Sequence, residues 1–496
     1  MLSVAHQRRS FEDVAARWWR PALLVSALLL GTVLRLSYGR NMPLWFDETF
    51  TGVIAGQGSI AGLWHWLQTE LAGPAFYGPY WLWAQVAGVS TEALRLPGLL
   101  FTLAAPLAVL RWGHRDPTMR LLWAAILLLW LPMGVFASDA RPYALLVLLG
   151  TLQAAAFCAL MREPSRWRAL MWVLPTLAMG LTHYIALLPG LVQGLLLLAV
   201  HRGAALRLWP AALPFALLAL WMAVHLPFVA RVAGGGMAIS THMVLADLAR
   251  MPALMVGDGS FALLLAAPLG WLGVEQLQGR TTDRFRPSPE WWTGFAGVAA
   301  FASMFVIACV APGMAQRYFI PMLPAAIFGV AWCLRCGVAR GSVAVAAFLG
   351  AMMVGCLGLT VSSLQDRSLD QRHAFGIDLA SRWLGEQPPL RLLFFWADVT
   401  ADLAPDLDRN VSEVGGFFLH RAGVALPVAV IHVPQDANAA AAVMARAARP
   451  GTAILWLSNA PSANPLRQPD ALVRDPRWTC RDFGQGLAVS IGCRPR

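Results

Sequence analysis

Uncharged apolar segments long enough to cross a bilayer recur through the first three quarters of this 496-residue chain. Clear examples cover residues 121–138, 142–161, 291–316 and 341–365. The hydrocarbon core of a membrane takes about 20 mostly apolar residues per helix. The sequence therefore predicts an α-helical polytopic membrane protein.

The overall composition supports membrane insertion and argues against a nucleic-acid partner. Charged residues make up 13% of the chain, whereas soluble domains average about 25%. The net charge of +11 comes from arginines that lie in short loops between apolar runs. This is the positive-inside pattern of membrane proteins rather than a basic binding face, so membrane lipids and not nucleic acids are the expected surroundings.

The arginine distribution also orients the chain. Four arginines precede the first span at residues 21–38, which places the N-terminus in the cytoplasm. Residues 74–89 form either a short span or an amphipathic helix in the outer interface, where Trp and Tyr are favoured. If they do not cross, the cytoplasmic loops between residues 111 and 340 carry 13 arginines and the opposite loops from residue 90 carry five. The interfacial alternative is therefore favoured.

This topology divides the chain into two predicted domains. Residues 169–200 must cross twice, since arginine-containing loops flank both ends, and the total is about 11 transmembrane helices. An odd number places the C-terminus outside. We expect a transmembrane domain over residues 1–365, with residues 42–92 as an outer loop of juxtamembrane helices. Residues 366–496 form a small α/β domain in the periplasm, and the whole chain belongs to the bacterial inner membrane.

The C-terminal segment has the pattern of a small α/β domain. Short apolar runs at residues 390–396, 428–433 and 453–457 predict strands, and the alanine-rich residues 438–449 predict a helix. Cys480 and Cys493 lie in the polar tail, and a periplasmic location favours a disulfide between them. The five other cysteines lie in or beside apolar helices and are expected to be inert packing residues.

Two adjacent carboxylates in the first outer loop are the main catalytic candidates. Asp47 and Glu48 follow Trp45 and Phe46 just after the first span. Neighbouring side chains diverge, so one can face a cavity while the other caps a helix or binds a nearby cation. A partly desolvated carboxylate is a stronger base and suits activation of an acceptor hydroxyl. The alternative is that both belong to a solvated helix start.

Further polar side chains gather at the same predicted face. Arginines at several helix ends could clamp a phosphate or diphosphate, and polar groups at membrane depth tend to be functional. For any single arginine the alternative is snorkelling to the interface. The candidate substrate-binding residues are Arg95, Asp139, Arg141, Tyr143, His183, Tyr184, Arg317 and Tyr318.

The order of these motifs resembles the integral-membrane glycosyltransferases of the C superfamily. The likeness is to the branch with protein O-mannosyltransferases, lipid A aminoarabinose transferases and rhizobial galacturonosyltransferases. It spans about residues 20–335. The matching elements are Trp45-Phe46-Asp47-Glu48, Arg95-Leu96-Pro97, Ser138-Asp139-Ala140-Arg141-Pro142-Tyr143, Thr182-His183-Tyr184, and Arg317-Tyr318 with Pro321 and Pro324.

The resemblance implies an inverting glycosyltransferase. It implies a polyprenyl-phosphate-linked sugar donor, an active site on the outer face, Asp47 as the catalytic base, and an envelope lipid, glycan or protein as acceptor. Glu48 would support Asp47 or bind a divalent cation, because some superfamily members use a metal and others do not. The stretch Ala72–Tyr77 lacks the polar residue that many relatives carry before a Pro-Pro-Leu-type motif, which leaves the acceptor open.

Two other functions are compatible with a chain of many spans. A transporter or lipid-linked sugar flippase would also have many spans, but such proteins usually contain two repeated halves with sites near the midplane. The sequence shows no internal repeat, and its polar residues cluster at one face. A non-catalytic assembly partner would leave the clustered arginines unexplained.

Overall fold

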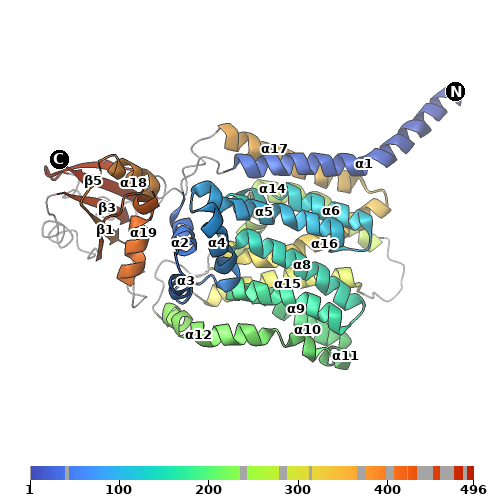
Figure 1. The fold of residues 1–496 in the computed structure, drawn as a ribbon. Helices are drawn as coiled ribbons and strands as arrows, with labels where there is room; N and C mark the ends of the chain where they lie inside the picture. The colour runs from blue at the N-terminus through green and yellow to red at the C-terminus, as the bar shows by residue number, and fades with distance from the viewer. Residues whose placement is uncertain are drawn as a thin grey trace.

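The protein is a helical bundle with a small α/β unit at one end (Figure 1). The computed structural model describes residues 2–38, 44–234, 243–278, 287–311, 316–365, 376–387, 389–397, 407–421, 423–432, 451–458, 474–483 and 489–496. The N-terminal end of α1 and the α/β unit lie at opposite ends of the bundle. An odd number of spans requires this arrangement.

Nine helical segments of the described residues are long and apolar enough to cross a membrane. They are built on α1 (Leu2–Ser37), α5 (Thr91–Ala108), α8 (Tyr143–Arg162), α10 (Leu188–His201), α12 (Phe215–Gly234), α14 (Gly259–Gln278), α15 (Pro289–Val310), α16 (Leu323–Ala339) and α17 (Val343–Gln365). Two other predicted spans correspond to α6 (Pro117–Leu129) and α9 (Arg166–Thr182), of 13 and 17 residues. The total of 11 therefore stays a prediction, whereas the multi-pass helical architecture is confirmed.

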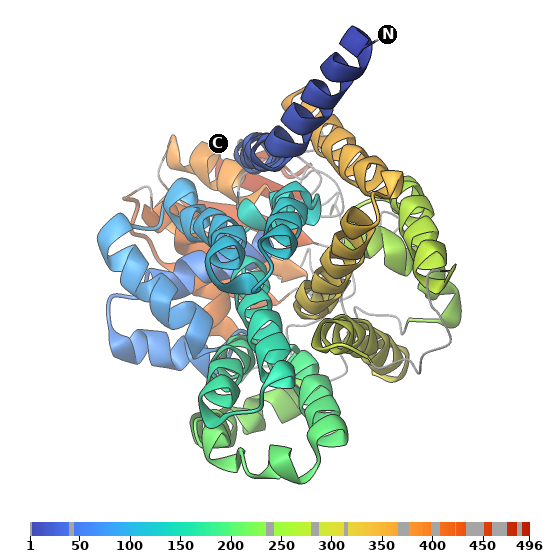
Figure 2. The ribbon, with the colours of Figure 1, turned by 90° about the vertical axis from the view of Figure 1, so that its right-hand side faces the viewer.

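Short helical turns connect or extend these helices. They are η1 (Val109–Gly113), α7 (Pro132–Ala137), η2 (Tyr184–Leu187), α11 (Gly203–Leu206), η3 (Trp209–Ala212), η4 (Leu245–Arg250), α13 (Met251–Val256) and η5 (Gln316–Met322). Seen nearly end-on, α1 and α17 lie at one edge of the bundle and the green helices α9–α12 at the other (Figure 2).

Helix α6 is short because it ends inside the bundle, and a buried arginine caps it there. The helix ends where Trp130 adopts extended backbone, and Pro132 begins the next helix. The guanidinium of Arg35, on α1, donates to the free carbonyls of Leu127 and Leu128 at 3.0 and 2.8 Å. Gly31 lets α1 approach this closely, since a Cβ there would lie 2.3 Å from the Leu128 oxygen. The cation thus satisfies helix-end carbonyls that water cannot reach.

The segment between α1 and α5, predicted to be the first outer loop, folds into three short helices between the bundle and the α/β unit (Figure 1). They are α2 (Phe46–Ala55), α3 (Ile60–Leu67) and α4 (Pro74–Ala87). Helix α4 has 14 residues and is not among the segments long enough to cross a membrane. The interfacial interpretation of residues 74–89 agrees with this length.

The α/β unit is a five-stranded mixed sheet with order β2-β1-β3-β5-β4. Strands β1 (Arg391–Ala397), β2 (Val428–His432) and β3 (Thr452–Ser458) are parallel and correspond to the three predicted strands. Strands β5 (Val489–Pro495) and β4 (Trp478–Asp482) extend the sheet in antiparallel fashion. Helices α18 (Ile377–Gly385) and α19 (Leu407–Arg421) pack against the sheet. The predicted helix at 438–449 lies outside the described residues.

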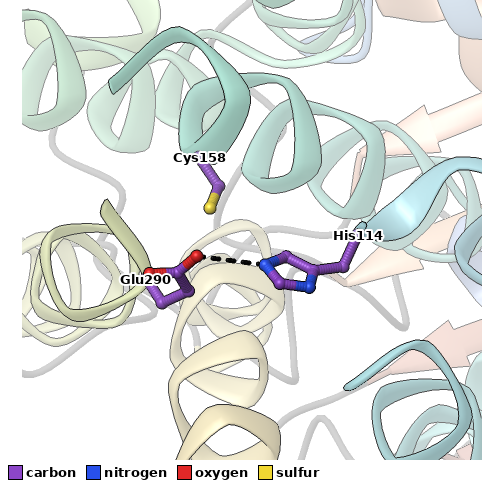
Figure 3. Close-up of side chains that lie close together, drawn as sticks. All are labelled: His114, Cys158 and Glu290. Atoms are coloured by element: carbon purple, nitrogen blue, oxygen red, sulfur yellow. Dashed lines mark hydrogen bonds and ion pairs between the residues drawn. The ribbon is translucent and has the colours of Figure 1, made fainter. Parts of the chain in front are cut away.

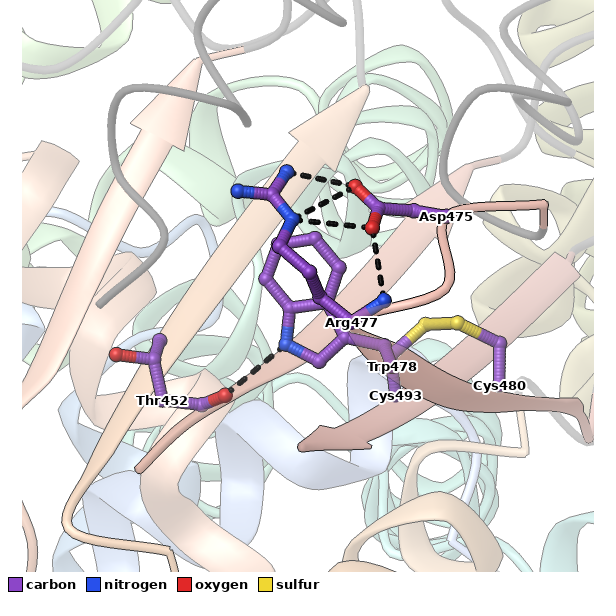
Figure 4. Close-up of a disulfide and its surroundings, with 6 residues drawn as sticks. All are labelled: Thr452, Asp475, Arg477, Trp478, Cys480 and Cys493. Carbon is purple, nitrogen blue, oxygen red and sulfur yellow. Dashed lines mark hydrogen bonds and ion pairs between the residues drawn. A yellow bond between two sulfur atoms is a disulfide. The ribbon is translucent and has the colours of Figure 1, made fainter. Parts of the chain in front are cut away.

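A disulfide joins the two antiparallel strands at the edge of this sheet. Cys480 on β4 faces Cys493 on β5 across the ladder, and their sulfurs are bonded (Figure 4). The pairing predicted from the polar tail is thereby confirmed. The adjacent Trp478 donates its indole N–H to the Thr452 carbonyl at 3.2 Å, which ties β4 to β3.

Candidate active site

Asp47 and Glu48 lie in the first turn of α2 and have separate sets of partners. The Glu48 carboxylate is fully buried. It accepts hydrogen bonds from Arg95 Nε and Nη2 at 2.9 and 2.6 Å, and from the backbone N–H of Ala140 and Trp45 at 2.8 and 3.1 Å. Glu48 therefore caps α2 and ties it to α5 and to the loop before α8.

The Asp47 side chain instead reaches Arg317 at the start of the tenth predicted span. Asp47 Oδ2 lies 3.2 Å from Arg317 Nη2, with the two side chains 20% and 38% exposed. Within the described residues, Oδ2 has no aligned hydrogen-bond donor. The contact is an ion pair without a directed hydrogen bond.

Arg141, in the loop before α8, contacts three segments of the outer loop and so ties them to the bundle. Its Nη1 donates to the Asp47 carbonyl at 3.1 Å and to the Tyr77 hydroxyl at 3.2 Å. Its Nη2 lies 3.6 Å from Glu70 Oε1. Burial raises the pKa of Glu70, and the Arg141 charge opposes that rise. A second acid therefore lies beside the same guanidinium as Asp47.

Arg317 presents the more accessible positive charge of the group. Its guanidinium lies over the rings of Trp45 and Tyr318, at 5.5 and 5.9 Å from their centroids. These cation–π contacts hold the charge at the opening while leaving donors available to an anion. Trp45 is fixed in turn, because its indole N–H donates to Asp139 Oδ1 at 3.0 Å.

His183 adds a neutral polar group to the same cluster. Its ring lies 5.2 Å from that of Tyr318. Burial, together with the charges of Arg141 and Arg317, lowers the pKa of His183 to about 4. The imidazole is therefore uncharged near neutral pH and can position a substrate by hydrogen bonding.

The structure does not bring all predicted substrate-binding residues into this cluster. The hydroxyl of Tyr184 is hydrogen-bonded to His225 Nδ1 at 2.7 Å, within a separate aromatic group that includes Trp221. Arg95 is paired with Glu48. Its guanidinium is thus already neutralised, although the residue still lines the adjacent cavity.

A cavity of about 840 Å³ opens beside Arg317 and extends between the helices. Its polar end is lined by Trp45, Asp139, Tyr143 and Arg317. Its apolar walls come from α7, α14 and α17 and include Val135, Phe136, Phe261, Gly355 and Leu359. The cavity can accommodate a ligand with an anionic head and a hydrocarbon chain.

Asp139 gives this end of the bundle a predicted pH dependence. Burial, with a contribution from the Glu48 carboxylate, raises the pKa of Asp139 from 3.8 to about 7. The folded protein then holds this proton more tightly than the unfolded chain, so stability declines as pH rises from about 4 to about 7. Melting temperatures measured across this window should fall with pH in the wild type and change less in D139N. Equal slopes in both would contradict the assignment.

The sequence leaves metal dependence open and names Asp47 or Glu48 as the ligand if a metal binds, and the two carboxylates differ in their fitness for this role. The Glu48 oxygens are occupied by four donors, so Glu48 is a poor ligand.

A second group with metal-ligand chemistry lies at the far end of α8. His114, Cys158 and Glu290 have their ligand atoms within 4.8 Å of one another (Figure 3). Arg162 pairs with Glu290 and places Nη2 within 3.1 Å of His114 Nε2. His114 Nδ1 accepts the Asp116 N–H at 3.0 Å, so the ring proton belongs on Nε2, facing Glu290. A metal would have to bind through the lone pair of Nε2, and that nitrogen carries the proton. The three residues are therefore better described as an ion-paired contact between helices.

Sequence reasoning missed Glu70 and Tyr77, although both contact Arg141. Glu70 belongs to no motif that the resemblance highlights, and Tyr77 lies in the stretch where this sequence departs from the relatives. A carboxylate in the same outer loop as Asp47 was the one available signal for Glu70. The stretch Ala72–Tyr77, which lacks the usual polar residue, supplies the Tyr77 hydroxyl instead.

Comparison with known proteins identifies the fold. No protein-family model and no curated protein matches the sequence. Two crystal structures of ArnT from Cupriavidus metallidurans superimpose with TM-scores of 0.56, one apo and one bound to undecaprenyl phosphate. They cover 97% of this chain and 98% of theirs, at 15% and 14% identity. An Archaeoglobus fulgidus oligosaccharyltransferase is more distant, with a TM-score of 0.47 and 11% identity over 88% of this chain and 67% of its own. The chain has the fold of the two ArnT structures.

Proposed function

We propose that the protein is an inverting glycosyltransferase that moves a sugar from a polyprenyl-phosphate carrier to an acceptor at the periplasmic face of the inner membrane. The observation that carries this proposal is the meeting of Asp47, Arg141 and Arg317 at one end of the bundle. These residues come from three segments far apart in the sequence. The ArnT likeness, which includes a complex with undecaprenyl phosphate, supports the donor class.

The cavity beside Arg317 suits a lipid-linked donor. Its apolar walls between α7, α14 and α17 would hold the polyprenyl chain, which gains by leaving water. The phosphate would then lie against Arg317, whose guanidinium is 38% exposed. Trp45 and Tyr143 line the same polar end, where the sugar would be placed. A single pocket thus offers a separate environment for each part of the donor.

The ion pair between Asp47 and Arg317 suggests how the donor prepares the base. The donor phosphate competes for Arg317, which frees the Asp47 carboxylate to take the acceptor proton. The acceptor oxygen attacks the anomeric carbon and forms the new C–O bond as the bond to the phosphate oxygen breaks. The electron pair leaves on the lipid phosphate, where Arg317 and Arg141 stabilise the charge. Attack opposite the leaving group inverts the anomeric carbon.

The test is a transfer assay with the full chain in nanodiscs. A panel of polyprenyl-phosphate sugars is supplied with envelope lipids, glycans and proteins as acceptors. We expect one donor to be consumed with release of polyprenyl phosphate. R317A should lower kcat/KM by about 100-fold through lost charge stabilisation, and R317K should recover part of it. R477A is the matched control, because Arg477 is exposed and lies just before β4 in the α/β unit.

A different set of results would support the flippase alternative. A protein that transfers no sugar from any donor, yet moves lipid-linked sugars between leaflets in proteoliposomes, would be the flippase alternative. Full activity in R317A would remove that arginine from the donor site.

A further inference from the structure

The α/β unit contacts the helix that carries the proposed catalytic base. Helix α19 packs directly on α2, and one continuous apolar core joins the juxtamembrane helices to the α/β unit. Figure 1 shows α19 on the side of the sheet that faces the bundle. The base Asp47 lies in the first turn of α2, and the α19 contacts lie in its later turns and just beyond them. The α/β unit is therefore placed to influence the site through α2.

The closest contact is between Phe417 and Gly52. A Cβ at Gly52 would lie 2.5 Å from Phe417 Cζ and 3.0 Å from both Cε atoms. The Phe417 ring thus points end-on at bare backbone, one and a half turns after Asp47. A side chain at residue 52 would force α2 and α19 apart.

Glu413, in the middle of α19, makes a polar contact with the segment just beyond the end of α2. One of its oxygens accepts hydrogen bonds from Gln57 Nε2 at 2.9 Å and from Trp66 Nε1 at 2.8 Å. Arg409 binds the other oxygen at 3.2 Å. A single carboxylate on α19 therefore holds both Gln57, just beyond the end of α2, and Trp66 in α3.

Arg421, the last residue of α19, makes a third contact with the outer loop. Its Nη1 lies 3.4 Å from the Val89 carbonyl and 3.3 Å from the Thr91 hydroxyl, between α4 and α5. Its guanidinium also lies over the Phe418 ring at 4.9 Å. The contact between α19 and the outer loop is thus fixed at three points.

Helix α2 depends on such contacts for its position. It has ten residues, and helices shorter than about 12–15 residues are marginal without tertiary packing. Glu48 secures its first turn, and α4 holds its end through the bond from Trp81 Nε1 to the Gln57 carbonyl at 2.7 Å. Helix α19 supplies the remaining side of its support at Gly52.

We propose that the α/β unit is a positioning element, in which Phe417 and Glu413 of α19 set the place of Asp47 through α2. This inference rests on the proposed function and adds to it a task for the α/β unit. Neither residue touches substrate, so neither is a catalytic residue.

The experiment compares G52A, F417L and the G52A/F417L double variant, with R477A as control. G52A should lower kcat about tenfold, because displacement of a base by about 1 Å is costly, while KM for the donor stays within about twofold. F417L makes room for the added methyl, so the double variant should recover to within about threefold of the wild type. Rates are normalised to polyprenyl-phosphate binding sites, so that unfolded protein does not count.

Each outcome bears on a different statement. A G52A variant with the wild-type kcat, or a double variant as slow as G52A with full donor binding, would overturn the positioning role and leave the transferase intact. A wild-type chain without transfer activity would overturn both. Since a merely structural defect lowers the number of donor sites and not the rate per site, the normalised kcat separates the two.

Discussion

Replacement of Asp47 by Asn is expected to slow sugar transfer by about a thousandfold while the protein folds and binds donor normally. Loss of a positioned general base typically removes 10²- to 10⁴-fold of rate. Asn keeps the shape of the side chain but cannot take the acceptor proton. Arg141 and Arg317, the proposed phosphate ligands, remain in place. The measurement is single-turnover transfer with saturating donor, alongside a donor-binding titration.

Glu70 makes this prediction sharper, because it is a second carboxylate beside Arg141. E70Q is the matched control and should slow single-turnover transfer far less than D47N. If E70Q lost the activity and D47N kept it, the base would be Glu70 and the sequence-based assignment would be wrong. Equal losses in both variants would instead indicate two carboxylates acting as a unit.

The membrane-spanning part of the fold could be predicted because hydropathy is a local property. The uncharged run 142–161, for example, corresponds to the single helix α8, and α4 at residues 74–87 is too short to be among the candidate spans, as the arginine bias had predicted. The length of α6 could not be predicted in the same way. Its end depends on Arg35, which reaches it from a helix about 90 residues earlier in the chain. A cap supplied across the bundle leaves no pattern in the sequence of the capped helix.

The strands of the α/β unit also differ in how well the sequence predicts them. The parallel strands β1–β3 are continuous apolar runs, as buried strands usually are, and all three were predicted. Strands β4 and β5 mix polar with apolar residues and form no continuous apolar run, so their pairing follows from neighbours and from the disulfide. Helix α19 was not anticipated, although its contact with α2 gives the unit its place beside the site.

The site itself was predictable as a set of residue types at one face, but its pairings were not. The predicted topology placed Asp47, Arg141 and Arg317 at helix ends on the same face, and the structure brings them together. Which acid pairs with which arginine depends on side-chain direction. Glu48 points inward to Arg95, and Asp47 points outward to Arg317. The sequence alone does not predict which of two adjacent side chains points in which direction.

Replacement of Glu48 by Gln should therefore affect stability far more than the same change at its neighbour. Glu48 is fully buried and Arg95 nearly so. Breaking a buried ion pair by removing one partner costs about 3–5 kcal/mol, because the other charge is left uncompensated. E48Q also weakens the bonds to the N–H groups of Ala140 and Trp45. We expect a large fall in the melting temperature measured in detergent.

Two variants decide whether that loss comes from the charge. The E48Q/R95Q double variant removes both members of the pair, so it should be more stable than E48Q alone, with a coupling of about 1–3 kcal/mol. D47N should melt close to the wild type, because the Asp47 carboxylate is partly exposed and its ion pair lacks a directed hydrogen bond. Similar melting temperatures for E48Q and D47N would mean that the two acids share one role. In that case neither the capping of α2 by Glu48 nor the freedom of Asp47 to act as a base could be maintained.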